Sequence, residues 1–212
     1  MTSSEVASRK PENFRKRPGL QGSIDDALTK PFLIVKGSGK AWSEVVQKAT
    51  DHHLQIFQEN WACYFRGDAP CKAEVEVTDA DISQKNLILF GEPASNILIE
   101  KVVALLPIVR TSTHCGIGSG LAGAPTFDAT THWPCLIHPN PLAGGDGHYI
   151  VIISGYTFGA QELKTLNYLL FPRIGDWAVL SGQPGSVVSK ESGIFDETWR
   201  RQGIAKTGSS IT

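Results

Sequence analysis

The clearest pattern in the chain is a short apolar run, a turn and an amphipathic segment between residues 85 and 107. Residues 87–90 form an unbroken apolar run, which is typical of a strand buried on both faces, as in a parallel sheet. Gly91-Glu92-Pro93 interrupts the run, and Ser95 or Asn96 can then cap a helix. Apolar residues recur at helical spacing up to Pro107. The pattern predicts a strand, a tight turn and a helix in that order.

Further apolar runs and segments with helical spacing follow along the rest of the chain. Apolar runs predict strands at residues 31–35, 108–110, 133–138, 149–153 and 177–180, and an alternating run predicts an edge strand at 74–78. Helical spacing predicts a long helix at 41–65, another at 160–170 and a single turn at 23–28, with a last short element at 195–199. Residues 111–131 are rich in small residues without a period, which favours a mobile loop.

Strands that alternate with helices predict an α/β fold. We expect three layers, with a mostly parallel sheet and helices on both faces, of the Rossmann or flavodoxin type. The domain should span residues 23–200. A basic arm at 1–22 and a tail at 201–212 should be loose, because both are poor in apolar residues.

Composition narrows the function classes. The chain has 212 residues, 41% of them hydrophobic, and a formal net charge of -1, so no overall field recruits nucleic acid or an anionic membrane. No apolar run approaches the roughly 20 residues of a membrane span, and the start of the chain lacks a signal-peptide pattern. The sequence therefore predicts a soluble protein.

The four cysteines do not decide whether the protein resides in an oxidising or a reducing compartment. Their spacing fits no common zinc pattern, so we expect no metal site. We also expect no cofactor. Cys63 could pair with Cys71, and Cys115 with Cys135, which would indicate a secreted or periplasmic protein. Free buried cysteines are the equal alternative.

Several phrases, in order along residues 16 to 200, coincide with a known family. They are residues 16–27, 86–91 with Ser95-Asn96, 138–141, Ser154-Gly155 with Thr157-Phe158, 171–176 and 195–199. Together they resemble the C-terminal α/β domain attached to prolyl-oligopeptidase-like serine hydrolases of environmental bacteria. The resemblance implies this fold and an association with hydrolases, but it transfers no catalytic residue, since the family's Ser-His-Asp residues lie in a preceding domain. The chain has Tyr156 where the family usually has His, and His138 where the family has Tyr.

Three predicted turns should meet at one sheet edge: Gly37-Ser38-Gly39, residues 91–96 and Ser154-Gly155-Tyr156. Acyl transfer needs a nucleophile, a base and two oxyanion donors. Ser154 is the first candidate nucleophile and Ser95 the second, although both serines also suit ordinary turn and cap roles. The candidate base is His138 or His132, and the carboxylate that would orient it is Asp176 or Asp128. The N–H groups of Gly91 and Gly155 are the candidate oxyanion donors. The candidate ligand-binding residues are Gly37, Ser38, Gly91, Glu92, Asn96, Gly155, Tyr156 and Thr157.

Two function classes follow. The first is a small ester hydrolase acting on carboxylesters, with a polyester as one possible substrate because the chain has five tryptophans. The second is a non-catalytic module that binds a ligand or polymer, or pairs with a hydrolase domain or its own copy. We also expect a homodimer, because Phe32, Trp42, Trp133 and Trp199 are many large apolar groups for a short chain.

Overall fold

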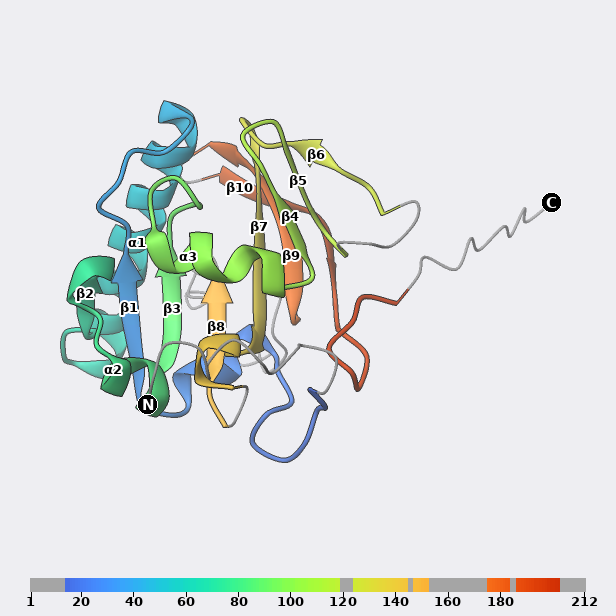
Figure 1. Cartoon of the computed structure of the whole chain (residues 1–212). Coiled ribbons are helices and arrows are strands. Elements are labelled where there is room, and N and C mark those ends of the chain that lie inside the picture. The colour runs from blue at the N-terminus through green and yellow to red at the C-terminus, as the bar shows by residue number, and fades with distance from the viewer. Residues whose placement is uncertain (1–13, 119–123, 145–146, 153–174, 184–185, 203–212) are drawn as a thin grey trace.

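The computed structural model describes residues 14–118, 124–144, 147–152, 175–183 and 186–202, which are coloured in Figure 1. These residues form a seven-stranded sheet in the order β10-β9-β7-β8-β3-β1-β2, and a separate three-stranded sheet. The strands of the larger sheet are β1 (Phe32–Lys36), β2 (Cys71–Ala73), β3 (Asn86–Phe90), β7 (His132–Pro139), β8 (Tyr149–Ile152), β9 (Trp177–Gln183) and β10 (Ser186–Gly193). The predicted strands at 31–35, 133–138, 149–153 and 177–180 are thereby confirmed.

The larger sheet is mixed. Strands β2, β1, β3 and β8 are parallel, whereas β7, β9 and β10 each pair with their neighbours antiparallel. The predicted mostly parallel sheet of the Rossmann or flavodoxin type is therefore wrong. An apolar run indicates burial but not strand direction. Linker length carries that information, because parallel neighbours need about a dozen linking residues, and residues 140–148 are too few to join β7 to β8 in parallel.

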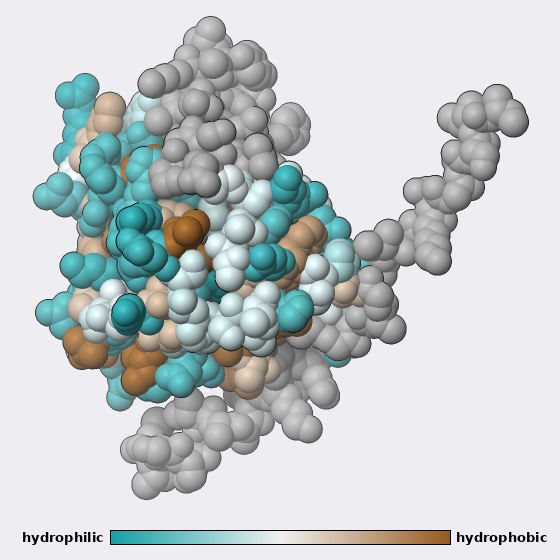
Figure 2. Space-filling view, turned by 90° about the horizontal axis from the view of Figure 1, so that it is seen from above, coloured by the Kyte–Doolittle hydropathy of each residue, from teal (hydrophilic) through white to brown (hydrophobic). Residues whose placement is uncertain are grey.

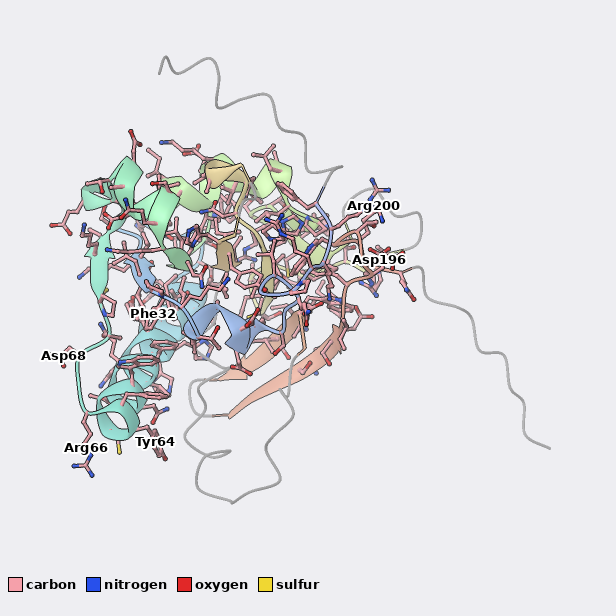
Figure 3. The ribbon with its side chains drawn as sticks, turned by 90° about the horizontal axis from the view of Figure 1, so that it is seen from below. Phe32, Tyr64, Arg66, Asp68, Asp196 and Arg200 are labelled. Carbon is pink, nitrogen blue, oxygen red and sulfur yellow. The ribbon has the colours of Figure 1, made fainter. Side chains whose placement is uncertain are left out.

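Helices cover the two faces of this sheet. The long helix α1 (Glu44–Phe65) lies on one face, and α3 (Ile97–Val102) lies on the other (Figures 1 and 3). Phe57 of α1 is fully buried and its ring contacts those of Phe32 and Phe90. The predicted helix at 41–65 is confirmed from Glu44 onward, and the predicted helix before Pro107 is α3 followed by the 3₁₀ helix η5 (Val103–Leu105). The short helix α2 (Asp79–Gln84) precedes β3.

The small sheet packs against β7 and β9. Its strands β4 (Ile108–Arg110), β5 (His114–Ile117) and β6 (Phe127–Asp128) are antiparallel. The strand at 108–110 is confirmed, but the mobile loop predicted at 111–131 is wrong where β5 and β6 form. A Cβ on Gly116 would lie 2.7 Å from the Pro125 carbonyl oxygen, so close backbone approach requires the small residue that hides the strand pattern.

Two further expectations can be compared with the structure. The helical turn predicted at 23–28 is the 3₁₀ helix η3 (Ile24–Leu28). The edge strand predicted at 74–78 is wrong, because the 3₁₀ helix η4 (Glu74–Glu76) occupies that place and the strand β2 lies just before it. A further 3₁₀ helix, η6 (Pro141–Ala143), follows β7. The helix predicted at 160–170 lies outside the described residues.

The first and last described segments pack together at the amino ends of the parallel strands. The Lys16 ammonium pairs with Asp176, whose carboxylate also accepts from the Phe195 N–H at 2.9 Å. Phe14 and Arg201 are both buried, so packed chain extends past the domain boundaries expected at 23 and 200. Three of the phrases that carry the family resemblance meet here, and each contributes structural contacts.

Two expectations on the cell environment can also be compared with the structure. All four cysteine thiols are free, so neither disulfide left open by the spacing is present. Among the described helices, none combines the length and the apolar character needed to cross a membrane.

Candidate functional site

Two of the three predicted turns lie side by side at the carboxyl ends of β1 and β3. The Gly39 N–H donates to the Ser95 carbonyl at 2.9 Å, and the Gly37 N–H donates to the Phe90 carbonyl at 3.2 Å. A Cβ on Gly37 would lie 2.2 Å from the Ser95 oxygen, so only glycine permits this approach. We call residues 37–42 and 91–96 the rim. The third turn, with Ser154, Gly155, Tyr156 and Thr157, lies outside the described residues.

Ser95 and Asn96 are used to shape the rim. The buried Ser95 hydroxyl accepts from the Glu92 N–H at 3.0 Å and donates to the Glu92 carbonyl at 3.3 Å. The Asn96 side chain accepts from the Leu98 N–H at 3.0 Å, which caps α3. Gly91 has a φ of +125°, which lets the chain turn sharply after β3. In the described part of the chain, the Ser95 hydroxyl therefore has a turn-closing role and no histidine partner.

Glu92, expected to bind a ligand, is instead one half of a buried ion pair. Its Oε2 accepts from Arg110 Nη2 at 2.6 Å, and both side chains are almost fully buried. Its Oε1 accepts from the Trp42 N–H. Arg110 Nη1 also donates to the carbonyls of Ala129, at 3.1 Å, and His132, at 3.3 Å. This network, which we call the Glu92–Arg110 network, ties the small sheet to the larger one beneath the rim.

Sequence reasoning missed Arg110 and the position of Trp42. The signal for Arg110 was a lone arginine at the end of an apolar strand, where burial requires a charged partner. The Trp42 ring lies over the Arg110 guanidinium, with 5.8 Å between the ring centroid and Cζ, yet 42% of Trp42 remains exposed. Nearby, the Ser38 hydroxyl donates to the buried Glu74 carboxylate at 2.7 Å.

His132 and Asp128 lie together on the same edge of the molecule. His132 begins β7, and its Nδ1 is 3.3 Å from the Asp128 carbonyl oxygen. The Asp128 carboxylate accepts from the Thr130 hydroxyl at 2.7 Å and from the Thr130 N–H at 2.8 Å. These bonds lower the pKa of Asp128. The structure therefore brings this base and carboxylate together, although the bond to the imidazole comes from the backbone.

His138 and Asp176 lie at the opposite end of the larger sheet. His138 pairs in register with Ile150 near the start of β8, and its ring packs on those of Phe14 and Trp199. Burial lowers the pKa of His138 to about 4, so it is neutral at physiological pH. Burial raises the pKa of Asp176, against the opposing effect of Lys16. Pairing either residue with the rim serine Ser95 is therefore wrong, because β7 runs antiparallel to β8 and carries His138 away from the rim.

The neutral, buried His138 predicts an acid-dependent loss of stability. An unfolded histidine gains a proton below about pH 6.5, whereas folded His138 does so only near pH 4. The stability contributed by neutral His138 is therefore full above pH 6.5 and is lost as the pH falls to about 4. Replacing His138 by leucine should remove up to about 3 kcal/mol of this pH dependence, measured by urea unfolding across that range.

Asp25→Asn provides a control in which the pH dependence of stability should change in the opposite direction. Burial raises the pKa of Asp25 to about 6, so the native protein gains stability from Asp25 as the pH falls from there toward 3.8. The asparagine variant should consequently lose stability with acid more steeply than the native protein. An unchanged pH dependence in the His138→Leu variant would contradict the neutral state of His138.

Comparison with known proteins gives no family. No protein-family model matches the chain, and no curated protein or solved structure matches it. The resemblance to the hydrolase-associated domain therefore stays a prediction from the sequence. Within the described residues, no three His, Cys, Asp or Glu side chains lie where they could hold a metal ion.

Exposed apolar side chains gather around the rim. Trp42 lies just before α1 and Val45 in its first turn, Ile97 begins α3, and Val75 lies on η4, which contacts α3. Figure 2 looks down on this side of the molecule and shows hydrophobic residues exposed among hydrophilic ones. The other aromatic residues expected to support self-association, which are Phe32, Trp133 and Trp199, are buried.

Proposed function

We propose that the chain is a non-catalytic module that binds another polypeptide through the rim. The observation that carries the proposal is Trp42, a large side chain that is exposed and yet fixed in place. Its backbone N–H is bonded to Glu92, and its ring lies over Arg110. Tryptophan is enriched among residues that dominate binding energy, and a side chain fixed before binding loses less entropy on binding.

The neighbours of Trp42 favour a polypeptide over a polysaccharide. They are the aliphatic residues Val45, Val75 and Ile97, each at least 44% exposed. Mixed aromatic and aliphatic surface suits apolar side chains of a protein partner. Of the five tryptophans, Trp133, Trp177 and Trp199 are buried, which weakens the case for a polymer-binding row of aromatic rings.

The use of the candidate catalytic residues also supports a binding role. Ser95 closes a turn, Glu92 is held by Arg110, and Asp176 is held by Lys16. A hydrolase requires its nucleophile and base in hydrogen-bond contact. Among the described residues, His132 and Asp128 lie together, but the Ser95 hydroxyl bonds to Glu92 within its own turn.

Selection from a displayed library of random peptides tests the proposal. Peptides selected on the native protein should bind the Trp42→Ala variant at least about 30-fold more weakly, because a hot-spot side chain contributes about 2 kcal/mol or more. Ile194→Ala removes a large apolar side chain that is 69% exposed just after β10, at the end of the sheet opposite the rim, and serves as the matched control. Equal binding to Trp42→Ala and the native protein, measured by titration calorimetry, would overturn the proposal.

A second candidate is the ester hydrolase with Ser154 as nucleophile. It is favoured by one observation, the proximity of His132 and Asp128 at the start of β7. A fluorophosphonate probe followed by mass spectrometry decides between the two functions. Labelling of Ser154, together with p-nitrophenyl ester turnover that Ser154→Ala abolishes, would establish the hydrolase. Absence of both favours the binding module.

A further inference from the structure

The C-terminal end of α1 projects from the molecule. Helix α1 ends at Phe65, and Arg66 adopts a left-handed conformation with a φ of +57°. Arg66, Gly67 and Asp68 are all exposed, and a Cβ on Gly67 would meet nothing within 4 Å. Figure 3 shows the side chains of Tyr64 and Arg66 at this outer end of the helix, and that of Asp68 on the loop that follows it. We call residues 64–68 the tip.

The tip has an apolar surface backed by the core. Tyr64 is 44% exposed and Phe65 is 57% exposed. The Phe65 ring stacks on Trp61 with centroids 4.3 Å apart, and Trp61 contacts Phe32 of β1 with centroids 4.7 Å apart. This stack connects the exposed ring to the sheet, so little side-chain freedom is lost if a partner covers it.

The tip also carries two opposite charges. Within the described residues, neither the Arg66 nor the Asp68 side chain forms an ion pair. A positive and a negative group two residues apart make the surface self-complementary. A two-fold axis brings the same patch of both copies together, so each charge can meet the opposite charge of the other copy.

We propose that a second copy of this chain binds at the tip about a two-fold axis. Arg66 of each copy pairs with the partner's Asp68, and the exposed Tyr64 and Phe65 rings form the apolar part of the contact. The two charge pairs fix how the copies are aligned, and the aromatic rings supply the apolar surface that the contact buries. The partner is thus identified by its complementarity to the tip.

The dimer leaves the rim accessible. Helix α1 follows β1 and precedes β2, which is parallel to β1, so α1 must run back to the amino ends of these strands. The tip consequently lies at the opposite end of α1 from the rim. The inference is independent of the proposed function, and either can fail alone.

Charge exchange in the full chain, followed by sedimentation velocity over a range of micromolar concentrations, tests the dimer. Arg66→Asp and Asp68→Arg should each raise the dimer dissociation constant at least about tenfold, because each places like charges together twice in a two-fold contact. The double variant restores both pairs and should return the constant to near the native value. Lys48→Glu reverses a charge on the same helix away from the tip and should have little effect.

Recovery in the double variant is the decisive result, since only reciprocal pairing produces it. Far-ultraviolet circular dichroism checks that the single variants remain folded, as expected for exposed positions. A native protein that stays monomeric, single variants that associate normally, or a double variant that stays as weak as the singles would each overturn the proposal.

Discussion

Replacing Arg110 by methionine is expected to lower the free energy of unfolding by about 3–5 kcal/mol. The substitution leaves Glu92 buried with its charge uncompensated, and it removes the donors to the Ala129 and His132 carbonyls. A lone buried charge has lost its hydration without gaining a partner, which is why removing one member of such a pair is so unfavourable. Urea unfolding followed by circular dichroism measures the change.

The double variant Glu92→Met, Arg110→Met separates charge burial from loss of packing. Because neither charge remains, this variant should be markedly more stable than Arg110→Met alone. It still lacks the acceptor for the Trp42 N–H, so full recovery is not expected. A double variant less stable than the single one would show that the ion pair is not the origin of the loss.

The central unit of the fold follows from local sequence signals. The apolar run of β3, the Gly91 turn and the Asn96 cap of α3 are each encoded within a few residues. The meeting of residues 37–39 with residues 91–96 follows from them, since β1 and β3 are parallel and their carboxyl ends must share an edge. These parts of the candidate site could be predicted from the sequence.

The positions of the candidate histidines could not be predicted, because they depend on the direction of β7. A parallel β7 would have placed His138 at the carboxyl edge, beside the turn after β3. The antiparallel β7 places His132 near that edge and His138 at the other end. Arg110 was missed for a different reason. A lone arginine after an apolar strand signals a buried charge, but its partner Glu92 belongs to another segment of the chain, and no local pattern identifies that partner.

The two proposed surfaces can act together. A dimer formed at the tips would present two rims at its outer ends, since each α1 runs from the rim to the tip. Two sites on one particle increase the avidity for a partner that repeats its binding segment, without any new contact. The chain would then serve as a bivalent adaptor, in accordance with the structural use of its candidate catalytic residues.

Trp199→Ala is expected to destabilise the fold by about 3–5 kcal/mol, as other buried large-to-small changes do. Trp199 is 1% exposed, and its ring contacts Phe195, His138 and Tyr149. The Lys16 ammonium lies over the ring at 5.0 Å from its centroid. Removal of the indole would leave a cavity where the first and last described segments meet, and thermal unfolding would measure the loss.

Trp199→Gly provides a control for this loss, because Trp199 has a φ of +61°. Both substitutions remove the whole indole, but only glycine adopts this backbone conformation without the steric cost of about 1–2 kcal/mol for L-residues. Glycine usually destabilises relative to alanine through the greater entropy of the unfolded chain. Here the relief of strain offsets that term, so Trp199→Gly should be at least as stable as Trp199→Ala. A glycine variant clearly less stable than the alanine variant would show that the backbone at Trp199 is unstrained and that the side chain alone sets its contribution.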